Sequence, residues 1–354
     1  MSPQIIAMYH KALKNREKLF AVAPMIDWTD RHCRFFHRQM TRHALLYTEM
    51  VVADAILHGD RGRLLDDDTP GPVALQLGGS DPDKLAKAVE LAAPWPYCEI
   101  NLNVGCPSDR VQSGTFGACL MRDPALVGRC IAAMKSATTL PVTVKCRLGV
   151  DDQDIGPALD ALAEAVWEAE ADGVWVHARK AWLEGLSPKQ NREVPPLDYG
   201  RVYRLKRENP SRFIGLNGGL ESLNHALGAI EGDDVVLDAV MLGRAAYQTP
   251  GILRDADRLF FGDARTPVNW EGLVEAMADH AAAHIQSGGR LHHVTRHMTG
   301  LFHGFAGARA WRQILSTEAV KPGAGPQVLF AAFEKVKPGL AAERHGAVSC
   351  GEPA

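Results

Sequence analysis

The sequence of 354 residues predicts an α/β fold, a (β/α)8 TIM barrel followed by a C-terminal helical (α-bundle) domain. Two observations predict this: eight short apolar runs rich in β-branched residues, and helical patterns between them. Buried strands that alternate with helices form parallel sheets. Eight such units in roughly 230 residues favour a closed barrel, which typically needs about 250, over an open doubly wound sheet.

The eight predicted strands are short and each is followed by turn residues. They begin at Leu19, Leu45, Pro72, Cys98, Pro141, Gly173, Phe213 and Ala239. Helical spacing of apolar residues is found in 81–93, 123–137 and 155–171, and the first two of these segments open with Asp-Pro, a helix start signal. No Gly-x-Gly-x-x-Gly follows the first strand, so a Rossmann dinucleotide site is not supported.

The chain divides into four predicted parts. Residues 1–18 form an N-terminal extension, 19–262 the barrel, 263–340 a helical domain and 341–354 a tail that we expect to be disordered. The helical domain is indicated by apolar residues at helical spacing, for example Leu273, Val274, Met277, Ala281 and Ile285.

Composition narrows the class of protein. Hydrophobic residues make up 46% and charged residues 23%, as in ordinary globular proteins, and no run reaches the roughly 18 apolar residues of a membrane span. The polar N-terminus has no signal-peptide pattern, so we expect a cytoplasmic protein. Seven cysteines without a CxxC pair or zinc-finger spacing predict free thiols, with no disulfide framework and no metal.

Charge is distributed unevenly along the chain. The net charge is −3, but the segment from His280 to Thr317 has no acidic residue and carries six histidines and four arginines. This pattern favours a local basic face for a polyanion over chance sampling in a helical domain.

The carboxyl ends of barrel strands line the active site in this fold. Polar, ionisable or glycine residues occur at the end of nearly every predicted strand. They are Ala23-Pro24-Met25, Glu49, Gln76, Asn101, Asn103, Cys106, Lys145, Arg147, His177, Arg179, Asn217-Gly218-Gly219 and Gly243-Arg244. Any one of these could be a strand cap, but the whole set predicts a site.

Two glycine-containing ends, Leu216-Asn217-Gly218-Gly219 and Leu242-Gly243-Arg244, precede helical patterns. Loops after strands 7 and 8 frequently bind phosphate in barrels, and Arg244 adds a charge-assisted donor. With Lys145 and His177 aimed at the cavity, this suits flavin mononucleotide (FMN). A Schiff-base lysine, as in barrel aldolases, is an alternative for Lys145 but leaves Cys106 unexplained.

Six motifs resemble the flavin-dependent tRNA-dihydrouridine synthases. They are APM (23–25), NLNVGCP (101–107), VTVKCRLG (142–149), VHAR (176–179), LNGG (216–219) and LGR (242–244). The stretches 177–199 and 292–312 resemble subfamily A, which acts on positions 20 and 20a of the tRNA D-loop. The resemblance covers roughly residues 19 to 316.

The resemblance implies a role for each strand-end residue. FMN contacts would come from Ala23, Pro24, Met25, Gln76, Lys145 and His177, and its phosphate end would lie against Asn217, Gly218, Gly219, Gly243 and Arg244. Cys106 would be the general acid. Reduced flavin would pass hydride to C6 of a uracil in tRNA, and NADPH would recharge it.

The chemistry agrees with a thiol as proton donor to C5, because free thiols have a pKa of about 8.5 and are mostly protonated at pH 7. We expect the loop 105–114 to close over the bound base. The uracil must leave the tRNA stack to reach the flavin, and stacking helps to offset that cost.

Several basic or polar residues are predicted to bind the RNA. Asn103 and Arg147 are candidates for the base or its phosphate, Lys189 and Arg192 form a pair after the sixth strand, and Arg309 and Arg312 lie on one helix face. We expect a monomer. Two alternatives remain open at this point: an FMN barrel enzyme for a free small molecule, similar to dihydroorotate dehydrogenases or ene-reductases, and a non-catalytic RNA-binding protein.

Overall fold

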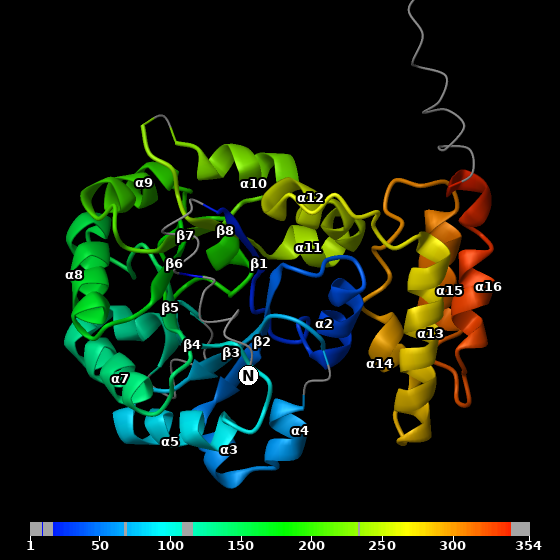
Figure 1. Cartoon of the computed structure of the whole chain (residues 1–354), viewed down its shortest axis with the longest axis horizontal. Coiled ribbons are helices and arrows are strands. Elements are labelled where there is room, and N and C mark those ends of the chain that lie inside the picture. Colours follow the sequence, from blue (N-terminus) through cyan, green and yellow to red (C-terminus); the bar gives the residue numbers. More distant parts are fainter. Residues whose placement is uncertain (1–8, 10–16, 67–68, 108–115, 233, 341–354) are drawn as a thin grey trace, which may run out of the picture.

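A closed barrel of eight parallel strands forms the centre of the molecule (Figure 1). The computed structural model describes residues 9, 17–66, 69–107, 116–232 and 234–340. The strands are β1 (Leu19–Val22), β2 (Leu45–Val52), β3 (Val73–Gly78), β4 (Glu99–Val104), β5 (Val142–Arg147), β6 (Gly173–His177), β7 (Ile214–Asn217) and β8 (Ala239–Leu242). Each pairs with its neighbour in sequence, and β1 also pairs with β8, which confirms the predicted (β/α)8 barrel.

Helices surround the barrel. They are α2 (Arg31–Arg38), α3 (Ala53–His58), α4 (Arg61–Leu65), α5 (Pro82–Ala92), α7 (Pro124–Ser136), α8 (Ile155–Glu168), α9 (Tyr199–Glu208), α10 (Leu223–Ile230), α11 (Arg244–Gln248) and α12 (Ala256–Phe261). Short 3-10 turns occupy Gly117–Arg122 (η1), Gln190–Arg192 (η2) and Pro250–Asp255 (η3). The Asp-Pro starts are confirmed, because the carboxylates of Asp81 and Asp123 accept N–H bonds from the first turns of α5 and α7.

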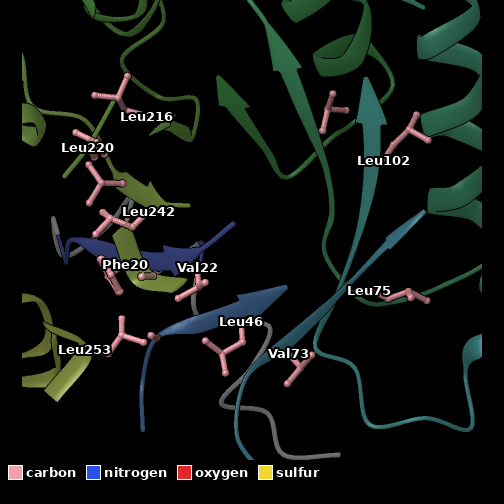
Figure 2. Close-up of a cluster of buried hydrophobic side chains, with 14 of the residues drawn as sticks. Phe20, Val22, Leu46, Val73, Leu75, Leu102, Leu216, Leu220, Leu242 and Leu253 are labelled. Carbon is pink, nitrogen blue, oxygen red and sulfur yellow. The ribbon is translucent and has the colours of Figure 1, made fainter. Parts of the chain in front are cut away.

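The strand residues alternate between two cores. Outward side chains such as Phe20, Leu75 and Leu102 pack with the surrounding segments in one large apolar cluster (Figure 2). The alternate strand residues point inward, and their side chains, including Tyr47 and Trp175, fill the interior of the barrel. This alternation is the period of two that a pleated strand imposes.

Two features close the bottom of the barrel. A Cβ atom on Gly215 would lie 2.3 Å from the ring of Trp175, so the absence of a side chain there makes room for the indole. Tyr9, from the predicted N-terminal extension, is only 3% exposed, and its ring meets Phe213 edge-on at 4.5 Å. At Tyr9 the extension is thus part of the barrel core.

The C-terminal helices form a separate group beside the barrel (Figure 1, yellow to red). They are α13 (Trp270–Gln286), α14 (Leu291–Thr295), α15 (Ala308–Thr317) and α16 (Gln327–Phe333). In this group α13 packs on α14 and α16, and α14 also contacts α2 of the barrel. Among the described residues, no helix combines the length and the apolar character needed to cross a bilayer.

Two details differ from the sequence-based expectation. Seven strands end one to three residues before the ends of the predicted apolar runs, whereas β2 extends to Val52, two residues beyond the end of its run. Helix α10 begins only at Leu223, after its N-cap Ser222, whereas α11 begins directly at Arg244. A helix start therefore follows Gly243 at once but does not follow Gly219.

Candidate active site

The strand register brings the predicted site residues together at one mouth of the barrel. Asn103 pairs with Lys145, Arg147 pairs with His177, and His177 pairs with Asn217 on adjacent strands. These inward positions lie at the carboxyl ends of β4 to β7. The residues that were predicted from separate motifs thus lie side by side at one end of the barrel.

Asn103 holds the loop that carries Cys106. Its side-chain oxygen accepts the backbone N–H of Gly105 at 3.0 Å and that of Cys106 at 2.9 Å. The Cys106 carbonyl accepts the N–H of Ala118 at 2.9 Å, and the thiol-bearing residue is half-buried. The predicted closing loop, 105–114, falls mostly on residues 108–115, which lie outside the described part of the chain.

Arg147 also holds the loop that carries Cys106. It is 4% exposed, and its guanidinium donates to the carbonyls of Gly105 (3.2 Å), Lys180 (3.2 Å) and Asn191 (2.9 Å). These bonds tie the loop after β4 to the loop after β6. The geometry gives Arg147 a positioning role, and its predicted contact with RNA stays a prediction.

Lys145 and His177 lie at this mouth of the barrel, and both have lowered pKa values. The Lys145 ammonium donates to the side-chain oxygen of Asn217 at 3.0 Å, and Asn217 donates to the carbonyl of Met241 at 2.7 Å. Burial, and then the charge of Arg147, lower the pKa of Lys145 to about 8. Burial with the charges of Arg147 and Lys145 lowers the pKa of His177 well below its usual value, so this imidazole is neutral at pH 7.

The loop after β7 has a backbone that favours glycine. Gly218 and Gly219 have φ values of 114° and 67°. A Cβ atom on Gly218 would lie 2.7 Å from Cδ2 of His177, so the imidazole rests directly against the main chain. The hydroxyl of Tyr199 donates to the Gly218 carbonyl at 2.6 Å and holds this turn in place.

Three guanidinium groups gather near the ends of β6 and β8. Arg244 forms an ion pair with Glu193 at 2.6 Å. Burial, and then the charge of Arg244, lower the pKa of both Arg179 and Arg192. Three cations thus lie close together here, an arrangement that can bind an anion.

The end of β1 completes this side of the mouth. Ala23 is buried and donates its N–H to the carbonyl of Leu242 at 2.7 Å, while Pro24 and Met25 are half-buried. A Cβ atom on Gly243 would lie 3.7 Å from both Ala23 and Met25, so the first and last strands meet here. Glycine backbone, clustered arginines and a half-buried lysine together fit a flavin mononucleotide.

Gln76 lies deeper than the other predicted residues. It is 1% exposed, it donates to Asn101 at 2.8 Å, and it accepts a hydrogen bond from Asn103 at 2.8 Å. Asn101 is not at a strand end but inside the barrel, fully buried. The predicted contact of Gln76 with the cofactor stays a prediction.

The predicted RNA-binding residues are spread more widely. Lys189 is exposed at the start of η2, and Arg192 at its end is half-buried. Arg309 and Arg312 are both exposed on α15 of the helical domain. The structure therefore presents basic side chains on both the barrel and the helical domain.

A cavity of about 720 Å³ lies between these two domains. Side chains from α2, α4, β2 and the segments near α13 and α14 line it, among them Arg31, Arg34, Glu49, Arg63, His284 and Arg296. Its lining is rich in cationic and imidazole groups.

The sequence-based reasoning missed a junction beside this cavity. The ring of Trp28, after β1, stacks on Tyr247 of α11 at 4.4 Å, and the Tyr247 hydroxyl lies 3.2 Å from Nδ1 of His297. His297 and Arg296 both bind the carboxylate of Asp30, the N-cap of α2. The basic stretch 292–297 was the one available signal; nothing in the sequence pointed to Asp30 as its partner.

Comparison with known proteins adds a decisive observation. The family described as dihydrouridine synthase matches residues 21–337. The chain belongs to the dihydrouridine synthase family. Every site residue predicted above, from Ala23 to Arg312, lies within the matched range.

Individual relatives in this family are similar along nearly their whole length. A tRNA-dihydrouridine(20/20a) synthase of Shewanella oneidensis is 51% identical over 330 residues, which is 93% of this chain and 97% of the relative. One of Escherichia coli K12 is 50% identical over 334 residues, 94% of this chain and 96% of the relative. One of Yersinia pestis is 52% identical over 320 residues, 90% and 92% of the two chains.

Proposed function

We propose that this chain is a cytoplasmic tRNA-dihydrouridine synthase that reduces uridines 20 and 20a of the D-loop, acting as a monomer with FMN and with NADPH as reductant. The observation that carries the proposal is the match to relatives of that name, at about half identity over more than nine-tenths of the chain. Membership of the dihydrouridine synthase family argues against both alternatives, an enzyme for a free small molecule and a non-catalytic RNA-binding protein.

The barrel mouth supplies the cofactor site in this proposal. Bound FMN, once reduced, supplies the hydride that C6 of the uracil receives. Arg244 and the turns at Gly218, Gly219 and Gly243 hold the phosphate, because they combine positive charge with backbone that a ligand can approach. Ala23, Pro24, Met25, Gln76, Lys145, His177 and Asn217 hold the remainder.

Lys145 and His177 differ in what they offer there. Lys145 is a half-buried cation that Asn217 orients, so it stabilises negative charge on the ring system. His177 is neutral and therefore offers one donor and one acceptor nitrogen.

Cys106 supplies the proton that C5 of the uracil needs. The S–H bond breaks, a C–H bond forms at C5, and the hydride at C6 completes the saturation of the ring. Asn103 and Arg147 hold the loop of Cys106 through the backbone of residues 105 and 106, so the thiol enters the cavity in a defined position.

The tRNA spans the barrel and the helical domain in this proposal. Lys189 and Arg192 contact phosphates near the mouth, and Arg309 and Arg312 contact phosphates farther away. Asn103 and Arg147 lie beside the extruded base. The uracil enters alone because the rest of a folded tRNA is too large for the barrel mouth.

The test is an anaerobic spectroscopic titration. The purified protein should show flavin absorption that bleaches with NADPH and returns with tRNA lacking dihydrouridine, but not with free uridine. Cys106→Ala should bind tRNA yet reoxidise about 10²–10⁴-fold more slowly, the usual contribution of a general acid. Cys119→Ala, which removes another half-buried thiol, is the matched control. A protein that takes up no flavin, or one that tRNA does not reoxidise, would overturn the proposal.

A further inference from the structure

A column of buried polar side chains runs up the inside of the barrel beneath Cys106. It starts at Glu99 and passes through Thr143, Asn101 and Gln76 to Asn103. The exposed fraction is 1% or less for the first four and 9% for Asn103. The strand register aligns it, because Asn101 pairs with both Gln76 and Thr143 on the neighbouring strands.

Each link in the column is a hydrogen bond. The Thr143 hydroxyl donates to Glu99, and the Asn101 amide donates to Thr143 at 2.7 Å. The Gln76 amide donates to Asn101 at 2.8 Å, and the Asn103 amide donates to Gln76 at 2.8 Å. The Asn103 oxygen then accepts the two N–H groups of the Cys106 loop.

The first group of the column, the Glu99 carboxylate, accepts several hydrogen bonds. Glu99 accepts hydrogen bonds from Thr143, from Tyr47 at 2.6 Å and from Tyr9. These three hydroxyls satisfy a carboxylate that would otherwise be very costly to bury. Burial raises the pKa of Glu99 to about 7, and the hydroxyl donors oppose this rise.

The chemistry of the two ends sets the direction of every link. An ionised carboxylate only accepts, so the single hydrogen of Thr143 is used on Glu99 and Thr143 must accept from Asn101. The Asn101 oxygen then faces Gln76, the Gln76 oxygen faces Asn103, and the Asn103 oxygen faces the loop. Backbone N–H groups only donate, so this is the one direction that also satisfies the upper end.

We propose that Glu99 is a positioning residue for the proton donor: it sets the direction of the hydrogen-bond column that presents the Asn103 oxygen to Gly105 and Cys106. The inference rests on the proposed function for its consequence in catalysis. A neutral amide at position 99 can donate to Thr143 and so reverse the column. The Asn103 amide would then face the two backbone N–H groups, donor against donor, and the loop would lose its anchor.

The test compares four variants of the full chain at pH 8.5, where the Glu99 carboxylate prevails. Glu99→Gln and Thr143→Val remove the group that fixes the donor-to-acceptor order of the hydrogen bonds. Thr143→Ser retains the hydroxyl and should preserve this order. Tyr47→Phe is the matched control, because it removes a donor to the same carboxylate but lies outside the links that lead to Cys106. Thermal midpoints show the loss of stability in each variant.

Two measurements report on Cys106. The first is kcat and KM for tRNA; we expect kcat to fall about tenfold or more in Glu99→Gln and Thr143→Val, with KM within about twofold. The second is the iodoacetamide alkylation rate of Cys106 relative to Cys119 in the same sample, mapped by mass spectrometry. We expect this ratio to change about threefold or more in these two variants and to stay unchanged in Thr143→Ser and Tyr47→Phe.

The outcomes separate the inference from the proposed function. If Thr143→Val loses no more kcat than Tyr47→Phe, or leaves the alkylation ratio unchanged, the column does not position Cys106 and the inference is wrong. If Glu99→Gln does not fold, the two Thr143 variants still decide. A wild-type protein that fails to reduce tRNA would remove the proposed function, while the alkylation ratio would still test the column.

Discussion

Lys145 illustrates, at the scale of one residue, a conflict between function and stability. Its folded-state pKa of about 8 lies below the usual value for lysine, so the fold opposes the charge that the residue carries at pH 7. This cost is fully present below about pH 8 and disappears as the pH rises through the unfolded value near 10.5. In the proposed function, a bound flavin that is stabilised by a cation would account for a lysine at this position.

We predict that Lys145→Met stabilises the flavin-free protein and weakens flavin binding. The thermal midpoint at pH 7 should rise by about 2 °C or more, because an apolar side chain of similar length has no charge to desolvate. Calorimetry and a flavin titration measure the two effects. Lys87→Met, at an exposed site on α5, should change neither. A lower midpoint for Lys145→Met would contradict this account.

Asn103 and Arg147 show how side chains can hold a site together through the backbone of a loop. Both were predicted to touch RNA, which stays a prediction, and both form hydrogen bonds to the backbone of residues 105 and 106. A guanidinium that donates to three carbonyls is held in place, and so are the loops it joins. Substitution of either residue is therefore expected to affect kcat through the position of the thiol.

At the scale of one element, α15 separates a packing face from a charged face. Trp311 and Leu315 are buried, and the indole N–H of Trp311 donates to the carbonyl of Met298 at 2.8 Å. Arg309 and Arg312 point to solvent from the other side. The apolar face holds the helix in its domain, which leaves the arginines available to a polyanion.

We predict that Arg309→Ala and Arg312→Ala each weaken tRNA binding and reduce its salt dependence. Each lost phosphate contact should lower the slope of log Kd against log salt by about 1. Fluorescence anisotropy across a KCl series measures this slope. The control is Arg207→Ala, which removes an arginine of α9 that is paired with Asp234. This variant should leave the slope unchanged. Equal slopes in all three variants would exclude α15 from the interface.

At the scale of the whole molecule, histidines join the barrel to the helical domain. Nδ1 of His32 on α2 lies 2.8 Å from Nε2 of His280 on α13, and the His32 ring also contacts the ring of His284 on α13. Within the helical domain, Nε2 of His284 lies 3.0 Å from Nδ1 of His293. Burial lowers the pKa of His32 to about 3, and it also lowers the pKa values of His284 and His293. At pH 7 the imidazoles of His32, His284 and His293 are therefore mainly uncharged.

We predict that acid weakens this junction. Because the folded pKa lies below the unfolded value near 6.5, the contribution to stability is present above pH 6.5 and is lost as the pH falls toward 3. The thermal midpoint should drop by about 2 °C or more between pH 7.5 and 5.5 on this account.

The matched variants isolate that effect. His32→Gln should reduce the drop between the two pH values, and His58→Gln, at an exposed position on α3, should not. Circular dichroism at both pH values measures it. An unchanged drop in His32→Gln would show that other groups control the acid response.

The fold could be predicted because its main signals are patterns among residues that are neighbours in the sequence. Strand alternation and the Asp-Pro helix starts are properties of neighbouring residues, so they can be read directly from the chain. The late start of α10 was missed because Ser222, its cap, is one of several polar residues after Gly219. Choosing among them depends on how the helix packs.

By itself, the sequence determined the barrel, the C-terminal helices, the family motifs and the strand-end residues, because periodicity and chain order are local. Only the tertiary structure decided which buried polar atoms meet. Glu99 alternates with apolar residues in β4, a visible sign of an inward position, but its partner Thr143 lies 44 residues away. The pairing of such groups depends on barrel closure and strand register, and these arise only when the whole sheet forms.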